Sequence, residues 1–278
     1  MARRALLGAA YKEPKGCGLA AYRATVAMDD IRADPDTAWI ADSRSLNLWF
    51  VVPQRLVGDL NTYQMMRRIG HNTHAMTYFI AEEKLYNMVL THPETDEPSS
   101  WDQSNALADM NATYQGWDSS LTKILDMVSK TQKWPIQQIE IPDQWSSNSG
   151  KLVLLGDAAH AMTPNMALGA AMAVEDAATL AECLKRLHSK DELRHAVDMY
   201  ERLRIPRCKL VQEASLLHGY LLHYPDGPLQ HARDAAMRLE VEGKHFIASP
   251  NQWSDPTTQL WCYTYDPVED VRRNWASS

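Results

Sequence analysis

One segment near the middle of the chain constrains the fold more than any other. Residues 150–187 read GKLVLLGDAAHAMTPNMALGAAMAVEDAATLAECLKRL. The apolar run KLVLL predicts a short buried strand that ends at Gly156, and an alanine-rich run from Leu168 predicts a buried helix. A strand, a tight turn and a helix in this order are typical of an α/β layer, so this part of the chain is expected to belong to an α/β domain.

The turn of this segment carries the residues that indicate a ligand site. Asp157 directly follows the predicted strand, at the end where ligands of α/β sheets usually bind. Its carboxylate can accept a hydrogen bond from a sugar hydroxyl, which contributes about 1.5–3 kcal/mol when one partner is charged. Gly169 and Ala170 open the helix with little side-chain bulk, so backbone N–H groups there can face an anion or an electron-rich ring. The residues alone indicate a site for a nucleotide-like cofactor.

The composition narrows the class of protein. The 278 residues are 45% hydrophobic and 23% charged, which is typical of a globular protein and not of a disordered chain. The 35 acidic residues outnumber the 28 basic ones, so no nucleic-acid partner is expected, because phosphate binding needs a basic face. No apolar run reaches the roughly 18 residues of a membrane span, so no membrane association is expected. The four cysteines form no CxxC pair and no targeting signal is recognised, so a reduced, cytoplasmic protein is expected.

Strands and helices are expected in different parts of the chain, which makes the predicted fold class α+β. Four apolar runs bounded by turn formers predict an antiparallel sheet in the first half, at residues 18–28, 46–52, 73–81 and 85–91. Helical spacing follows over 105–130, and a short strand is expected at 136–141. A helix over 191–223 is expected to be broken or kinked by Pro206, and the tail from residue 245 to be irregular but packed.

The segment from Gly156 closely resembles the second flavin-binding motif of the FAD-dependent aromatic hydroxylases, the salicylate-hydroxylase-like flavoprotein monooxygenases. The family pattern is G-D-A-A-H-x-x-x-P-x-x-x-Q-G-A-x-x-A-x-E-D-A. The matching residues are Gly156, Asp157, Ala158, Ala159, His160, Pro164, Gly169, Ala170, Ala173, Glu175, Asp176 and Ala177, and Leu168 stands in place of the glutamine. The resemblance implies FAD as cofactor, held by Gly156, Asp157, Pro164, Gly169 and Ala170. It places Asp157 at the ribityl chain and Gly169 with Ala170 by the isoalloxazine ring.

Two residues of the predicted sheet resemble substrate-binding residues of the family. In related fungal enzymes that act on polyketide phenols, an arginine and a tyrosine on neighbouring strands hold the phenolate, and Arg23 and Tyr78 match them. A guanidinium favours the ionised phenol, whose ring is the better nucleophile. The resemblance therefore implies a monooxygenase of secondary metabolism that hydroxylates a phenolic or polyketide substrate with NAD(P)H and oxygen. From the residues alone, a surface ion pair for Arg23 and simple packing for Tyr78 remain open.

The resemblance also divides the chain into three regions. They are a substrate-binding sheet domain at 1–145, a carboxyl-terminal FAD-binding motif at 146–190 and a helical and irregular region at 191–278. The family's amino-terminal Rossmann half has no counterpart, so the chain is expected to be truncated. Residues 16–21 match G-x-G-x-x-A by letter but are expected to lead into a strand, not a helix. Residues 50–68 have no family counterpart and are expected to be an insertion, from a retained intron or a mispredicted exon.

Two other functions stay open. A truncated chain without a pyrophosphate-binding element would be a catalytically silent family member. A chain that only reuses the substrate cavity would be a cofactor-free binding protein or a cyclase-type catalyst. No metal site is expected, because strand spacing puts His71 and His74 on opposite faces and no carboxylate or cysteine cluster completes a site. His160 is expected to be structural.

Overall fold

The computed structural model describes residues 2–42, 47–49, 72–98 and 101–275. The chain forms two compact units, each built from separate stretches of sequence. Unit 1 comprises residues 1–17, 137–220 and 247–278, and unit 2 comprises residues 18–136 and 221–246. The predicted insertion at 50–68 lies outside the described residues.

Unit 2 is built on a five-stranded sheet with the strand order β2-β3-β4-β1-β5. The strands are β1 (Lys15–Ala27), β2 (Asn47–Trp49), β3 (His74–Ile80), β4 (Leu85–Pro93) and β5 (Gln132–Gln138). The pairs β1–β4, β2–β3 and β3–β4 are antiparallel, as the alternating apolar pattern predicts. A turn at residues 81–84 joins β3 to β4, and β1 contains Gly16 to Gly18, which confirms that this glycine pair does not begin a helix.

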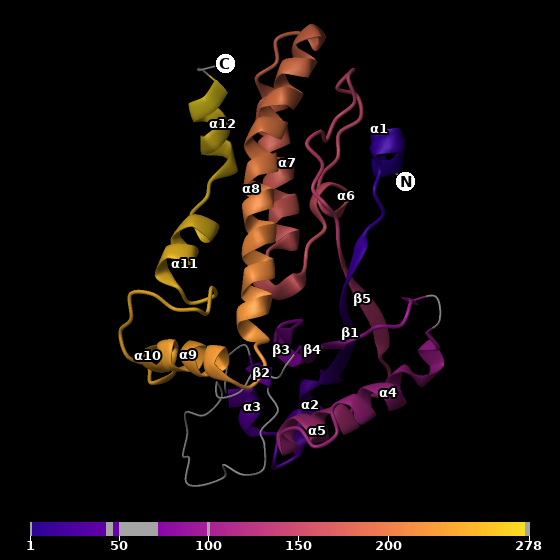
Figure 1. Ribbon diagram of the computed structural model, residues 1–278, viewed down its shortest axis with the longest axis vertical. Coiled ribbons are helices and arrows are strands. Elements are labelled where there is room, and N and C mark those ends of the chain that lie inside the picture. Colours follow the sequence, from indigo (N-terminus) through magenta and orange to yellow (C-terminus); the bar gives the residue numbers. More distant parts are fainter. Residues whose placement is uncertain (1, 43–46, 50–71, 99–100, 276–278) are drawn as a thin grey trace. The chain divides into compact units, whose positions relative to one another are not determined.

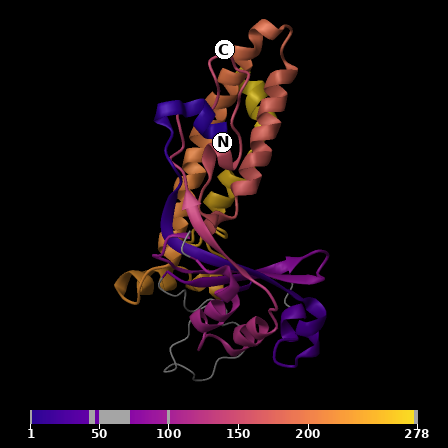
Figure 2. The same ribbon diagram turned by 90° about the vertical axis from the view of Figure 1, so that its right-hand side faces the viewer.

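One face of this sheet carries the hydrophobic core of unit 2. Alternate residues of β1 and β4, such as Tyr22 and Met88, are buried there. Short helices cover this face (Figure 2). They are α2 (Met28–Ala33), α3 (Trp39–Asp42), α4 (Ala106–Thr113) and α5 (Ser119–Asp126). The helical spacing over 105–130 thus belongs to two helices, because Gly116 adopts a φ of +80° and Asp118 caps α5 by accepting from the Ser120 and Leu121 N–H groups.

Unit 1 is mostly helical, and its two longest helices lie side by side (Figure 1). They are α7 (Gly169–Lys185) and α8 (Leu193–Leu222), and α8 continues through Pro206 without a break. Shorter helices are α1 (Ala2–Leu7), α6 (Asp157–His160), α11 (Pro256–Tyr263) and α12 (Pro267–Trp275). Two more helices, α9 (Pro228–Ala236) and α10 (Arg238–Val241), belong to unit 2. No helix in the described segments combines the length and the apolar character that crossing a bilayer requires.

Three expectations about elements were wrong. Residues 151–155 do not form a strand: their β-pairing within the described chain is one isolated bridge between Ser146 and Val153, because no described neighbouring strand offers a longer ladder. The strand expected at 136–141 is β5, which begins earlier at Gln132 and ends at Gln138. The tail is not irregular, because α11 and α12 both lie beyond residue 245.

Candidate functional site

The motif segment of unit 1 turns sharply at Gly156. This residue adopts φ +57°, a conformation that side chains with a Cβ rarely take. A Cβ here would also lie 3.3 Å from the Cβ of Ala173 on α7. The Gly156 N–H donates to Asp176 Oδ2 at 2.9 Å. Glycine therefore allows the turn to approach α7 closely, and the role of Gly156 is to permit this backbone conformation.

Asp157 and the beginning of α7 provide the exposed polar groups of this segment. Asp157 opens α6 with its side chain exposed, and it has no hydrogen-bond or ion-pair partner among the described residues. Helix α7 begins at Gly169 without a side-chain cap, so its first N–H groups are not satisfied within the helix. A Cβ on Gly169 would meet nothing within 4 Å, and Ala170 is exposed. A free carboxylate and an open helix start fit a flat, hydroxyl-bearing cofactor.

Pro164 and Leu168 lie in the segment that leads into α7. Pro164 is exposed and begins a short 3-10 turn that ends at Met166. Leu168, in the place of the family's glutamine, is buried in the core of unit 1. The Leu168 side chain therefore packs into the core under the turn, and it has no polar atom that could bind a ligand.

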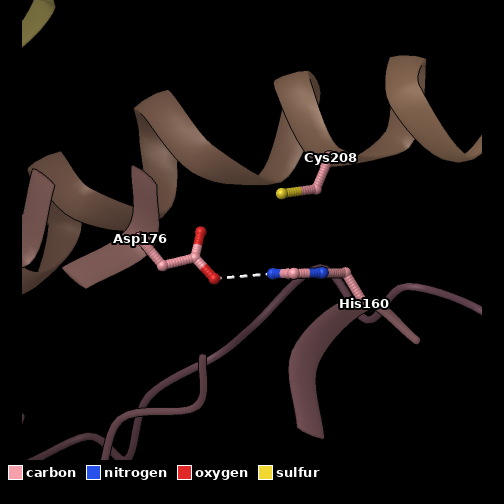
Figure 3. A group of neighbouring side chains, drawn as sticks. All are labelled: His160, Asp176 and Cys208. Carbon is pink, nitrogen blue, oxygen red and sulfur yellow. Dashed lines mark hydrogen bonds and ion pairs between the residues drawn. The ribbon is translucent and has the colours of Figure 1, made fainter. Parts of the chain in front are cut away.

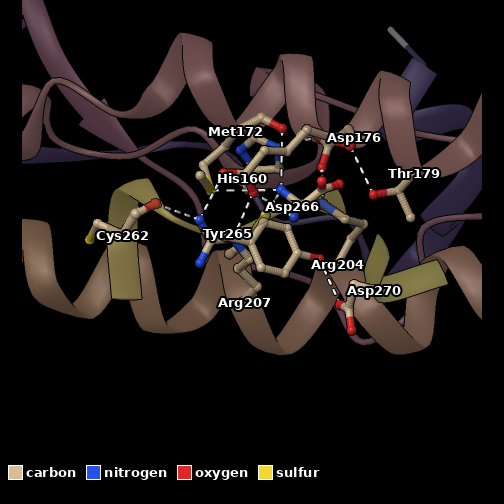
Figure 4. A network of polar contacts seen from close by, with 12 residues as sticks. His160, Met172, Asp176, Thr179, Arg204, Arg207, Cys262, Tyr265, Asp266 and Asp270 are labelled. Carbon is tan, nitrogen blue, oxygen red and sulfur yellow. Dashed lines mark hydrogen bonds and ion pairs between the residues drawn. The ribbon is translucent and has the colours of Figure 1, made fainter. Parts of the chain in front are cut away.

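Two buried residues of the motif, His160 and Asp176, form a charge cluster with Arg204 of α8. Asp176 is fully buried and accepts hydrogen bonds from the Gly156 N–H, from His160 Nε2 at 2.6 Å and from Arg204 Nε at 2.8 Å (Figure 4). Burial alone would raise the pKa of this carboxyl, but the bonds and the charge of His160, together with Gly156 and Arg204, hold the pKa below its ordinary value. The Asp176 carboxylate is thus fully hydrogen-bonded, whereas the other ring nitrogen of His160, Nδ1, is buried without a hydrogen-bond partner in the described chain.

His160, Asp176 and Cys208 also approach each other closely enough to resemble a metal site (Figure 3). Their candidate ligand atoms all lie within 4.8 Å of one another. However, the guanidinium of Arg204 binds Asp176 and lies 3.6 Å from Cys208 Sγ, so a fixed positive charge already occupies the site. Burial raises the pKa of the Cys208 thiol to about 12, which keeps it protonated and a poor ligand at neutral pH. We therefore assign the three residues a structural role.

The charge cluster extends to the carboxyl-terminal tail through Glu175. This carboxylate binds Arg204 Nη1 at 2.7 Å and both Nε and Nη2 of Arg207 at 2.6 and 2.7 Å. The Arg207 guanidinium lies 3.8 Å from the ring centroid of Tyr265, and the Tyr265 hydroxyl donates to Asp270 at 2.8 Å (Figure 4). These contacts join α7, which carries Glu175, to α8 and to the carboxyl-terminal tail.

The two predicted substrate residues lie on one face of the unit 2 sheet, opposite its core. Arg23 on β1 pairs with Val89 on β4, which pairs with Met76 on β3. Tyr78 lies two residues further along β3, opposite Asn87. Both side chains are exposed, Tyr78 at 37%. Strand spacing places their Cα atoms about 12 Å apart, so these two long side chains can both reach an atom that lies between them.

Sequence reasoning missed other residues of this sheet face. Asn87 and Thr91 alternate with buried apolar residues of β4 and therefore share the face with Arg23. His74 lies opposite Thr91, and its Nδ1 is 2.7 Å from Nε2 of His223, with both rings buried and stacked. The polar residues of β4 were visible as a period of two in the strand, but their importance depends on the register with β3.

Comparisons with known proteins identify the family of the chain. A family profile described as "FAD binding domain" matches residues 33–215. The FAD-dependent monooxygenase OpS4 of Beauveria bassiana is 32% identical over 257 residues, which cover 92% of this chain and 55% of that protein. The 3-amino-4-hydroxybenzoate 2-monooxygenase PtnB3 of Streptomyces platensis is 33% identical over 67% of this chain and 46% of its own length. The chain spans about half the length of these relatives.

Two solved structures share the fold. The crystal structure of CtdE with FAD and a substrate has a TM-score of 0.72 at 24% identity and covers 99% of this chain and 60% of that one. A salicylate hydroxylase substrate complex has a TM-score of 0.67 at 21% identity, over 97% of this chain and 60% of the other. The extent of the profile match, together with the sequence relatives, establishes that the chain belongs to the FAD-binding-domain family, which includes FAD-dependent monooxygenases.

Proposed function

We propose that this chain binds FAD and acts as a monooxygenase that hydroxylates a phenolic or polyketide aromatic ring, with NAD(P)H as the electron donor, in secondary metabolism. The observation that carries the proposal is that Asp157 is exposed and has no partner among the described residues, in the same motif as the uncapped start of α7. The named activities of OpS4 and of PtnB3 support the reaction class. When bound, FAD would supply the redox chemistry that takes electrons from NAD(P)H and activates oxygen.

The motif residues divide the work of holding the cofactor. Asp157 would accept hydrogen bonds from hydroxyl groups of the ribityl chain, because a carboxylate accepts strongly and has no competing partner in the described chain. Gly156 keeps the turn against α7. Gly169 and Ala170 would present backbone N–H groups to the ring, with no Cβ of Gly169 to obstruct a planar group. Pro164 would fix the turn that leads into this helix.

The sheet face that carries Arg23 and Tyr78 would hold the substrate. Arg23 would bind the oxygen of the phenol and favour its ionised form, because its guanidinium is permanently charged. Tyr78 would add a second hydrogen bond to the same oxygen or to its neighbour. Both groups bind and orient the ring, and Arg23 lowers the energy needed to remove the phenol proton. The three functional regions at 1–145, 146–190 and 191–278 remain part of this proposal.

FAD retention tests the proposal directly. The purified chain is incubated with FAD, passed through a desalting column and examined for flavin absorbance. We expect retained flavin, and NAD(P)H oxidation that a phenol stimulates. A colourless wild-type chain would contradict the proposal and favour the cofactor-free binding protein or cyclase-type catalyst. Retained flavin without phenol-stimulated oxidation would instead favour the catalytically silent family member.

A further inference from the structure

On the face of the unit 2 sheet that carries Arg23 and Tyr78, two polar side chains have a buried polar atom without a hydrogen-bond partner in the described chain. The side-chain amide nitrogen of Asn87 and the hydroxyl oxygen of Thr91 are both buried, with no hydrogen-bond partner in the described chain. Thr91 as a whole is 1% exposed. Buried polar groups in native proteins are almost always hydrogen-bonded, so unmet groups need an explanation. A ligand that supplies the missing partners is one such explanation.

Their position on the sheet supports a ligand. Asn87 lies directly opposite Tyr78 on β3 and Thr25 on β1, and Arg23 pairs with Val89, two residues further along β4. Thr91 lies four residues further along β4, opposite His74. Asn87 is therefore next to the residues proposed to hold the phenol, and Thr91 marks the far end of the same face beside the buried imidazole pair of His74 and His223.

The surface between the two polar groups is apolar. Val89 separates Asn87 from Thr91 on β4, and its neighbour across the sheet is Met76. Four residues of strand span about 13 Å, which is longer than a single benzene ring with its substituents. The face therefore offers a hydrogen-bonding group at each end and an apolar strip in the middle.

We propose that Asn87 and Thr91 bind two oxygen substituents at opposite ends of an elongated aromatic substrate. The substrate class is a fused or linked ring system with a hydroxyl or carbonyl oxygen at each end, and not a monocyclic phenol. Asn87 donates to the oxygen that Arg23 and Tyr78 also contact, and Thr91 binds the distant oxygen. This inference rests on the proposed substrate face and adds to it the length and the second polar group of the substrate.

A pair of ligands that differ in one oxygen tests the inference. Isothermal titration calorimetry on the full chain compares 2,6-dihydroxynaphthalene, with an oxygen at each end, with 2-naphthol, which has one. We expect the wild type to bind the diol more tightly. Thr91→Val should remove this preference by weakening diol binding about three- to tenfold, the loss of one hydrogen bond, with 2-naphthol unaffected. Asn87→Leu should weaken both ligands.

Thr25→Val is the matched control, because Thr25 shares the sheet face and strand geometry but is exposed. It should leave both affinities unchanged. Thermal unfolding provides a second readout: Thr91→Val should keep or raise the Tm, because an apolar side chain of the same shape removes an unmet buried hydroxyl. A lower Tm for Thr91→Val, an equal loss for both ligands or no binding of the diol by the wild type would each overturn the inference.

The flavin measurement separates this inference from the proposed function. Retained FAD with phenol-stimulated NAD(P)H oxidation, but no preference for the diol, would refute the inference and leave the monooxygenase proposal standing. A Thr91-dependent preference for the diol in a chain that retains no FAD would support the inference about the ligand and refute the proposed enzyme.

Discussion

Two aspartates of one motif have opposite environments. Asp157 is exposed and has no partner in the described chain, whereas Asp176 is fully buried and accepts three hydrogen bonds. A side chain that stabilises the fold is expected to be satisfied by the fold, and one that binds a ligand is expected to be available to it. The first aspartate is therefore the candidate for function and the second for stability, although the sequence pattern treats both alike.

Removing the exposed carboxylate tests the functional half of this contrast. We expect Asp157→Ala to raise the dissociation constant for FAD about tenfold or more, because it removes a charge-assisted hydrogen bond. The Tm of the apoprotein should hardly change, because the side chain has no described partner. Flavin titration followed by fluorescence measures the affinity, and Asp191→Ala, another exposed acid of unit 1, is the control. A variant with wild-type affinity would exclude Asp157 from the cofactor site.

Removing the buried carboxylate tests the structural half. Asp176→Asn leaves Arg204 buried with one charged partner fewer, which typically costs about 3–5 kcal/mol in the free energy of unfolding. The pKa of Asp176 is lowered in the folded state, so its contribution is complete above the ordinary carboxyl value of about 4 and is lost as the pH falls through the folded value. Urea unfolding should show a wild-type advantage at pH 7 that shrinks below about pH 4. An equal advantage at every pH would argue against this ionisation.

Arg23 tests the substrate face at the same scale. Arg23→Gln should lower kcat/KM for a phenol at least tenfold and move the rate optimum to higher pH, because the bound phenol would ionise less readily without the guanidinium. Arg32→Gln, an exposed arginine on α2 in the same unit, should change neither quantity. Stopped-flow or steady-state NAD(P)H oxidation across the pH range provides the measurement. An unchanged profile would place Arg23 in a surface role.

Residue types alone could identify the flavin motif, because its spacing is long and local in sequence. They could not find Asn87 or Thr91, whose significance depends on the register with β3, where Asn87 pairs with Tyr78 and Thr91 with His74. Nor could they separate the two aspartates by burial, because Arg204, which satisfies Asp176, lies 28 residues further along the chain. Contacts across such separations are set by packing, not by local pattern.

At the scale of elements, local signals predicted strands and helices well where the pattern was periodic. The β3–β4 hairpin and α7 follow the expected ranges within a few residues. The prediction of a strand at KLVLL was wrong. A strand needs a neighbouring strand to pair with, and the composition of a segment does not show whether one is available. The tail helices were missed although each begins with an Asp-Pro pair, Asp255-Pro256 and Asp266-Pro267, and Asp255 caps α11 by accepting from the Thr258 N–H.

Tyr265 is one of the residues that attach the tail helices to α8. Tyr265 contacts Arg207 through its ring and Asp270 through its hydroxyl. We expect Tyr265→Ala to lower the free energy of unfolding by about 3 kcal/mol, the typical effect of removing a large, partly buried aromatic side chain. Limited proteolysis should cut the variant near α12 earlier than the wild type. Tyr263→Ala is the control, because that ring is 52% exposed, and equal cleavage of both variants would contradict the role of Tyr265.

At the scale of the whole molecule, each unit has a hydrophobic core of its own and the two cores share no described residue. The chain passes between the units several times, because each is assembled from separate stretches. A sequence-based division into consecutive regions cannot reveal that each unit is assembled from separate stretches. Separate cores nevertheless predict that damage to one core is felt mainly within its own unit.

Paired core substitutions test this independence. Met88 and Met172 are both fully buried, the first in the core of unit 2 and the second in the core of unit 1. Each change to alanine should cost about 2–5 kcal/mol through lost contacts and a residual cavity. In native-state hydrogen exchange, Met88→Ala should accelerate exchange of the amides of β1, β3 and β4 and leave those of α7 unchanged, and Met172→Ala should do the reverse.

Saturating FAD should then restore protection to α7 in Met172→Ala, because a ligand at about 100 times its dissociation constant adds about 2.7 kcal/mol to the stability of the unit that binds it. If both substitutions accelerated exchange throughout the molecule, the units would unfold together, and protection by FAD confined to unit 2 would place the cofactor away from Asp157.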